Sequence, residues 1–137
     1  MRSKTIIGAL LLFTVLGVGT VATGDPAGSV PQWAIVWVSR PTLIGSTVVE
    51  GPVLFAHDES KMRRGEPCTT VYLFEPSHGP AEEVVSFHCI PTPRPVVSQF
   101  TMRTRPNVDL GYGCVLTEYQ FAGDAEAHGV PLAAHGH

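Results

Sequence analysis

The sequence lacks several features that would assign the chain to a large class of proteins. Only 15% of its residues are charged, and Asp+Glu outnumber Lys+Arg by 12 to 9. The chain therefore has no basic surplus with which to neutralise phosphates, and we expect no nucleic-acid partner. It also contains no G-x-S-x-G, H-E-x-x-H or G-x-x-x-x-G-K-[ST] motif and no C-x-x-C pair, so the motifs predict no enzymatic activity.

The one long apolar run lies at the N-terminus. A basic start with Arg2 and Lys4 is followed by an apolar stretch over residues 6–18 and by small residues up to Gly24. This order is typical of a secretory signal peptide over residues 1–24, with cleavage after Gly24 or Ala22. We therefore expect a secreted or periplasmic protein that has no membrane association after cleavage. The alternative is an uncleaved anchor, because the run is long enough to span a bilayer.

After residue 24 the chain shows no sustained helical repeat, and its prolines stand mostly at the edges of short apolar runs. These runs are rich in β-branched and aromatic residues, which favour strands. The expected strands are residues 33–38, 43–49, 52–57, 68–74, 82–89, 98–105 and 114–121. The sequence thus predicts an all-β fold, a small antiparallel β-sandwich of about seven strands, with a small β-barrel as the alternative.

The segments between these runs have their own signals. Glu50-Gly51 has the length and the glycine of a hairpin turn. The charged residues 58–67 predict an exposed loop with one helical turn, and the prolines of 91–95 predict an edge strand or a crossover. Residues 25–121 are long enough for a single β domain. From Ala122 onward no apolar pattern is present, so we expect residues 122–137 to form a flexible tail that carries histidines.

The clearest hairpin runs from Cys68 to Cys89. If its arms pair symmetrically about the middle of the loop, the two cysteines lie opposite each other and within reach of a disulfide. Three cysteines in an oxidising compartment are typical of one disulfide and one odd thiol. We therefore predict a Cys68–Cys89 disulfide and a free thiol at Cys114. Centring the later turns in the same way places Cys114 opposite Arg103, and Arg103 opposite Ser86.

Histidines offer the only further chemistry. The tail provides three candidate metal ligands, which are His128, His135 and His137. A flexible tail of imidazoles could hold copper, nickel or zinc, but weakly, because binding has to order the tail. Further candidates on the fold are His57, His78 and His88. The sequence predicts that His88 and the adjacent Cys89 face opposite sides of a strand and so cannot share one ion.

Two functions are compatible with these patterns. The first is a secreted or periplasmic binding or structural module without enzymatic activity, for a ligand that the sequence does not identify. Its predicted partner contacts are Lys61, Arg63 and Arg64, a basic group that would favour an acidic partner. The alternative is a small periplasmic metal-binding protein that uses the tail histidines. Neither the oligomeric state nor a role for Cys114, as inert thiol, ligand or nucleophile, follows from the sequence.

Overall fold

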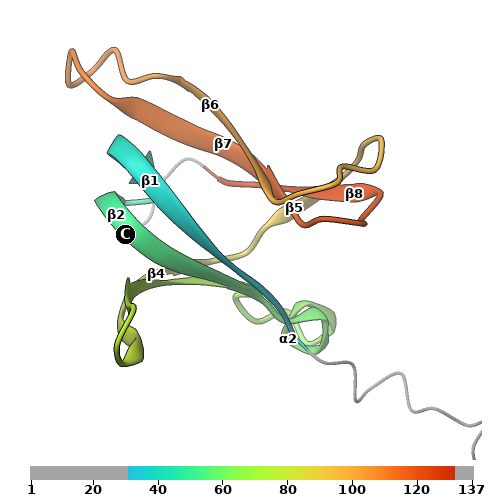
Figure 1. Cartoon of the computed structure of the whole chain (residues 1–137). Coiled ribbons are helices and arrows are strands. Elements are labelled where there is room, and N and C mark those ends of the chain that lie inside the picture. Colours follow the sequence, from blue (N-terminus) through green and yellow to red (C-terminus); the bar gives the residue numbers. More distant parts are fainter. Residues whose placement is uncertain (1–30, 132–137) are drawn as a thin grey trace, which may run out of the picture.

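The computed structural model describes residues 31–131, so the predicted signal peptide and the tail residues His135 and His137 lie outside the described part. Within it the strands are β1 (Gln32–Ile44), β2 (Thr47–His57), β3 (Thr69–Glu75), β4 (Gly79–Phe87), β5 (Ile90–Pro93), β6 (Thr101–Pro106), β7 (Cys114–Gln120) and β8 (Glu126–Gly129). One short helix, α2 (Glu59–Arg63), follows β2 in this part of the chain (Figure 1). The predicted all-β fold and the helical turn after residue 57 are both confirmed.

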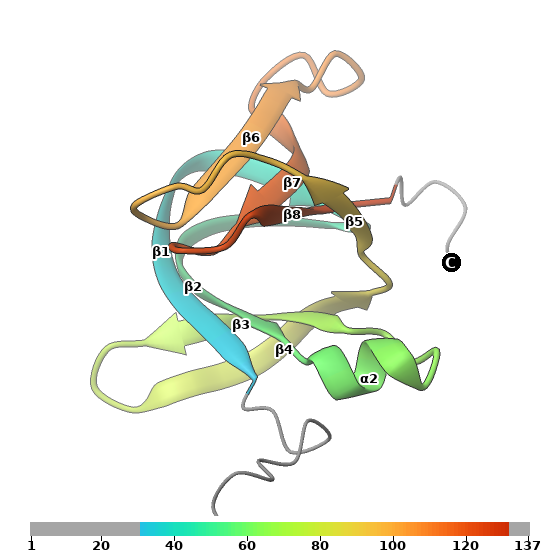
Figure 2. The same ribbon diagram turned by 90° about the vertical axis from the view of Figure 1, so that its right-hand side faces the viewer.

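The described strands form a single eight-stranded sheet. Its order is β4-β3-β2-β1-β7-β8-β5, and β6 pairs with β7 off this path. All strand pairs are antiparallel except β1 with β7, which are parallel at Thr42 and Leu43. The sheet curls into a half-barrel, as Figure 2 shows, and its two end strands β4 and β5 follow each other directly in the chain. The fold is thus one curled mixed sheet, and the proline-rich β5 lies at its edge as predicted.

The first hairpin turns at a different place from the predicted one. β1 and β2 are joined by the two-residue turn Gly45–Ser46, where Gly45 has a φ of 60°. A glycine with positive φ at the first position is typical of a type II′ hairpin. The predicted turn at Glu50–Gly51 is wrong, because this pair lies inside β2. Gly51, with a φ of 93°, instead marks the point where the register with β1 becomes irregular.

The core occupies the concave face of the curled sheet. Phe55, Tyr119 and Phe121 are almost fully buried there, and the partly buried Phe100 packs against all three rings. Neighbouring ring centroids lie 5.1 to 5.9 Å apart in tilted, stacked or edge-to-face arrangements. Each such buried ring stabilises the fold by roughly 1.5–3 kcal/mol. This aromatic column gives the half-barrel a rigid interior.

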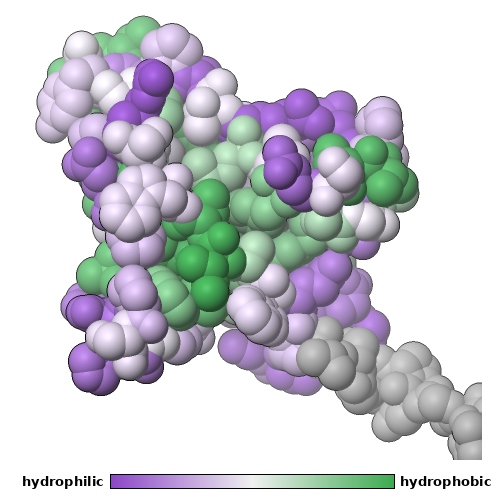
Figure 3. All heavy atoms as spheres, in the orientation of Figure 1, coloured by the Kyte–Doolittle hydropathy of each residue, from purple (hydrophilic) through white to green (hydrophobic). Residues whose placement is uncertain are grey.

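The opposite face of β1 is apolar but exposed. Trp33, Ile35 and Trp37 share this face, as their spacing predicts, and they are 62%, 47% and 69% exposed. Figure 3 shows apolar side chains gathered near the middle of this side of the molecule, over β1. The alternation of β1 therefore leaves two tryptophans in water while Val38 on the inner side is buried.

The predicted pairing of the later strands is wrong. In the described sheet β6 pairs only with β7, so Arg103 does not lie opposite Ser86. Cys114 pairs with Pro106 rather than with Arg103. The reason is that the turn is centred on Leu110, whereas the prediction placed its centre between Val108 and Asp109. The register also shifts by one residue after Arg103.

The predicted flexible tail from Ala122 is wrong for residues up to Pro131. Residues 126–129 form β8, which is inserted between β7 and β5. Its two central residues, Ala127 and His128, are 0% and 1% exposed. A strand of four residues carries no readable alternation, and its place in the sheet is set by partners distant in sequence. His128 is therefore a buried residue of the fold rather than a tail residue.

Candidate metal centre

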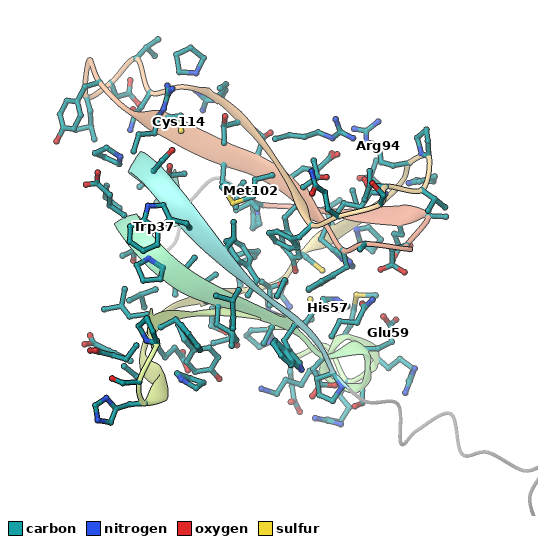
Figure 4. All side chains as sticks on the ribbon, viewed as in Figure 1. Trp37, His57, Glu59, Arg94, Met102 and Cys114 are labelled. Atoms are coloured by element: carbon teal, nitrogen blue, oxygen red, sulfur yellow. The ribbon has the colours of Figure 1, made fainter. Side chains whose placement is uncertain are left out.

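Three side chains with metal-binding atoms meet at one end of neighbouring strands. His57 is the last residue of β2, Cys68 immediately precedes β3, and Cys89 lies between β4 and β5. The β2–β3 and β3–β4 ladders both end at Thr69, which brings these three positions together. The ligand atoms of the three residues all lie within 4.8 Å of one another, and all three residues are buried. Figure 4 shows His57 beside α2, at this end of the molecule.

The two cysteines approach each other, but not through the predicted register. Symmetric pairing would place Thr70 opposite Phe87, whereas Thr70 pairs with Ser86. The chain beyond β4 nevertheless brings Cys89 back, so that its N–H donates to Cys68 Sγ at 3.3 Å and the two sulfurs lie 3.0 Å apart. The predicted proximity is confirmed. The predicted disulfide is not present, because the cysteines in the described part of the chain are free thiols.

A second imidazole lies beside this group. His128 on β8 places its Nδ1 3.5 Å from Cys89 Sγ, and its ring centroid lies 4.2 Å from that of His57. The Nε2 atoms of both histidines are buried and have no hydrogen-bond partner. A buried polar atom without a partner costs about 1–3 kcal/mol. Such a cost at two adjacent rings is a signal that the site receives a ligand.

Burial sets the protonation of this cluster. It lowers the pKa of His57, although the nearby carboxylates, above all Glu59, oppose the shift. Burial, followed by the neighbouring His57, lowers the pKa of His128 to about 4. Burial, followed by the contact with Cys68, raises the pKa of Cys89 to about 12. Near neutral pH both imidazoles are therefore uncharged electron-pair donors, while the Cys89 thiol keeps its proton until a metal displaces it.

The distances suit a single metal ion. Zinc ligands lie about 2.0–2.3 Å from the ion, so two ligands in a tetrahedron are roughly 3.3–3.8 Å apart. The 3.5 Å between Cys89 Sγ and His128 Nδ1 falls in this range, so His128 would bind the ion through Nδ1. The 3.0 Å between the sulfurs would have to open by under about 1 Å. Two thiolates and two imidazoles form a donor set that suits zinc or copper.

A buried hydrogen bond supports the cluster from behind. The Thr69 hydroxyl and the Tyr119 hydroxyl bond to each other, and both residues are 0% exposed. The Tyr119 ring stacks on His128 with centroids 5.0 Å apart. Burial raises the pKa of Tyr119, so its hydroxyl stays neutral. Tyr119 thus fixes the position of the His128 ring without adding charge to the site.

The remaining candidate histidines and Cys114 lie elsewhere. His78 is exposed in the β3–β4 turn, and His88 points outward while its neighbour Cys89 is buried, which confirms that the two face opposite sides. Cys114 contacts the Thr42 hydroxyl at 3.3 Å. Figure 4 places Cys114 and His57 at opposite ends of the molecule. None of these side chains can join the cluster.

The residues of the predicted basic contact group lie together, on and beside α2. Lys61 and Arg63 lie on α2 and Arg64 is its C-cap residue, where it pairs with Glu66 at 2.9 Å. The basic residues of β6 lie on the far side of the molecule from α2 in both ribbon views (Figures 1 and 2). One of them, Arg103, is paired with Glu118. The basic residues of β6 therefore do not extend the group on α2.

Comparison with protein families, curated proteins and solved structures finds no match for this chain. Among residues 31–131 no helix has the length and apolar character needed to cross a membrane. The feature that bears on function is therefore the geometry of His57, Cys68, Cys89 and His128, called the N2S2 cluster below. The sequence contained these four residues as separate candidates, but without β8 nothing indicated that they meet.

Proposed function

We propose that this protein is a small metal-binding β domain that holds one zinc or cuprous ion in the N2S2 cluster. The observation that carries the proposal is the convergence of three buried donor residues, His57, Cys68 and Cys89, whose ligand atoms lie within 4.8 Å of one another, with His128 Nδ1 3.5 Å from Cys89 Sγ. Buried polar groups in proteins nearly always have partners, and a metal ion would provide one for His57 Nε2, which is buried and has no hydrogen-bond partner. Of the tail histidines that the sequence favoured, only His128 belongs to this group.

The donor set supports binding rather than hydrolysis. Catalytic zinc sites keep an open position for water, whereas sites with four protein ligands are closed and structural. The N2S2 cluster offers four donors within a buried region. The proposed role is therefore to hold, carry or buffer a metal ion, or to stabilise the fold through it, in the secreted or periplasmic location that the N-terminal sequence predicts.

The metal and the predicted disulfide are alternative states of Cys68 and Cys89. A disulfide compound can accept the two electrons: one thiolate attacks it and releases a thiolate, and the second cysteine then displaces the other half to close the Cys68–Cys89 bond. The products are one protein disulfide and two small thiols, with no sulfur pair left to bind metal. The metal-bound form therefore requires reduced protein, and a bound ion would protect the pair from oxidation.

The test is an anaerobic zinc titration of the reduced protein, monitored by calorimetry and by measurement of the intact mass. We expect one zinc per chain, and a stabilisation of about 2.7 kcal/mol at free zinc one hundred times the dissociation constant. Cys89→Ser should abolish tight binding, while the matched variant Cys114→Ser should keep it, because Cys114 lies away from the cluster. A wild-type chain that binds neither zinc nor copper(I), supplied anaerobically, would overturn the proposal.

The tail alternative is tested in the same experiment by a chain that ends at Pro131. This variant keeps β8 but lacks His135 and His137, so the N2S2 cluster predicts unchanged zinc affinity. If binding were lost with these two histidines and survived Cys89→Ser, the tail would be the site and our assignment would be wrong.

A binding module without metal remains the second candidate, favoured by one observation. Trp33 and Trp37 are 62% and 69% exposed on the same outer face, and large exposed apolar groups are typical of interaction surfaces. The two candidates differ in their response to metal. Zinc should raise the melting temperature of a metal-binding domain and leave that of a pure interaction module unchanged.

A further inference from the structure

A third sulfur lies beside the N2S2 cluster. The thiol of Cys89 donates to Met62 Sδ at 3.9 Å, and Met62 is partly buried against the core. Met62 belongs to α2, the helix between the ligands His57 and Cys68. Cys89 is the hub of this group, because its sulfur also lies 3.0 Å from Cys68 Sγ and 3.5 Å from His128 Nδ1.

The position of Met62 is set by the loop itself. Asp58 caps α2 by accepting hydrogen bonds from the N–H groups of Ser60 and Lys61. The Asp58 N–H in turn donates to the Cys68 carbonyl at 2.9 Å, which ties the start of the helix to the start of β3. The thioether is therefore held over the cluster by local hydrogen bonds rather than by chance packing of a free loop.

We propose that the ion held in the N2S2 cluster is cuprous copper and that Met62 Sδ is a ligand that favours copper(I) over zinc. This inference rests on the proposed function. Thioether sulfur is a soft donor that suits copper(I), whereas zinc takes thiolate, imidazole and carboxylate ligands. Met62 thus adds a donor that only one of the two ions uses well.

The net charge of the site also favours copper(I). A buried site is most stable when its net charge is near zero. One thiolate neutralises a monovalent ion, and the uncharged imidazoles and thioether add donors without adding charge. A divalent zinc ion needs both thiolates for neutrality. Cys89, the central residue of the group, would supply the single thiolate for copper(I). The adjacent Cys68 would supply the second thiolate that zinc needs.

The test compares copper(I) and zinc affinities of the reduced, full-length protein in anaerobic competition with chelators. Copper has to be supplied as copper(I), because two cupric ions would take one electron each from the two thiols and yield a disulfide, two cuprous ions and two protons. Met62→Leu keeps the side-chain volume, so folding should be retained. We expect this variant to lose copper(I) affinity by about tenfold or more and zinc affinity by under about threefold. Met102→Leu, at the partly buried methionine of β6, should change neither.

Cys68→Ala provides the converse arm, since it should weaken zinc far more than copper(I). Equal losses for both ions in Met62→Leu, or no loss of copper(I) affinity, would overturn the assignment of Met62. If the wild-type chain binds zinc tightly, and if its copper(I) affinity equals that of Met62→Leu, the site is a zinc site. The proposed function would then stand without this inference. A wild-type chain that binds neither ion would overturn both.

Discussion

The buried hydroxyl pair behind the cluster allows a quantitative test of the core. Thr69 and Tyr119 are 0% exposed and hydrogen-bond to each other. Tyr119→Phe removes one hydroxyl and leaves the other buried without this partner, as does Thr69→Val. An unsatisfied buried hydroxyl costs about 1–3 kcal/mol, whereas replacement of both partners by apolar groups of the same shape is nearly neutral.

We therefore expect each single variant to lower the free energy of unfolding by about 1–3 kcal/mol. The double variant should lose at least about 1 kcal/mol less than the sum of the two single losses, because it leaves no orphaned group. The loss in the double variant should also be smaller than the larger single loss. This non-additivity is the signature of a direct bond between the two hydroxyls.

The assay is urea unfolding of reduced, metal-free protein, with the denaturant slope compared between variants so that a shift in midpoint reports stability. Tyr112→Phe is the control, because Tyr112 is 61% exposed and its hydroxyl is in water. This variant should change stability by under about 0.5 kcal/mol. Losses at Thr69 and Tyr119 that add within about 0.5 kcal/mol would refute the bond and with it the proposed support for His128.

Two further predictions concern other parts of the fold. A Cβ at Gly113 would lie 2.4 Å from the Pro41 carbonyl oxygen, whereas one at Gly111 meets nothing within 4 Å, and both glycines have positive φ. Gly113→Ala should therefore cost at least about 2 kcal/mol more than Gly111→Ala, whose loss of about 1–2 kcal/mol reflects the backbone alone; equal losses in thermal melts would contradict the close approach. The pKa of Glu118 is lowered, first by its hydrogen bonds from Arg94 and then by the one from Arg103. The contribution of Glu118 to the stability of the fold is therefore fully present above the unfolded-state pKa near 4.5, and it is lost as pH falls through the folded-state pKa. Stability measured from pH 6 to pH 3 should consequently fall less steeply in Glu118→Gln than in the wild type, and parallel curves would show that the ion pairs do not contribute.

Local signals made the strands predictable. The hairpin between Cys68 and Cys89 carries β-branched and aromatic residues on both arms and turn residues between them, and the structure has β3 and β4 there. The helical turn in residues 58–67 was predictable for the same reason, since its cap and charges are close in sequence. The first turn was not, because both Gly45 and Gly51 are suitable turn residues. Only the register between β1 and β2 decides between them.

The candidate site could not be predicted from the sequence, because it depends on pairing between strands that are far apart in the chain. β8 has four residues and no apolar alternation, so the sequence offers no reason to place it in a sheet. Its insertion between β7 and β5 is what brings His128 to Cys89. Met62 gave no signal either, because a methionine in a charged loop is unremarkable until the loop is closed by the bond from Asp58 to Cys68.

The cysteine pair shows why proximity alone could not identify the chemistry. A disulfide needs sulfurs about 2.05 Å apart and a shared tetrahedral ion needs them about 3.8 Å apart, so the same strand geometry serves both with movements of about 1 Å. The 3.0 Å separation of Cys68 and Cys89 lies between these two distances. The surroundings of the pair favour a bound ion over a disulfide, because a disulfide would not interact with the two adjacent imidazoles. His57 on β2 and His128 on β8 supply these imidazoles from segments far apart in the sequence, so no local pattern in the sequence could indicate that they meet beside the pair.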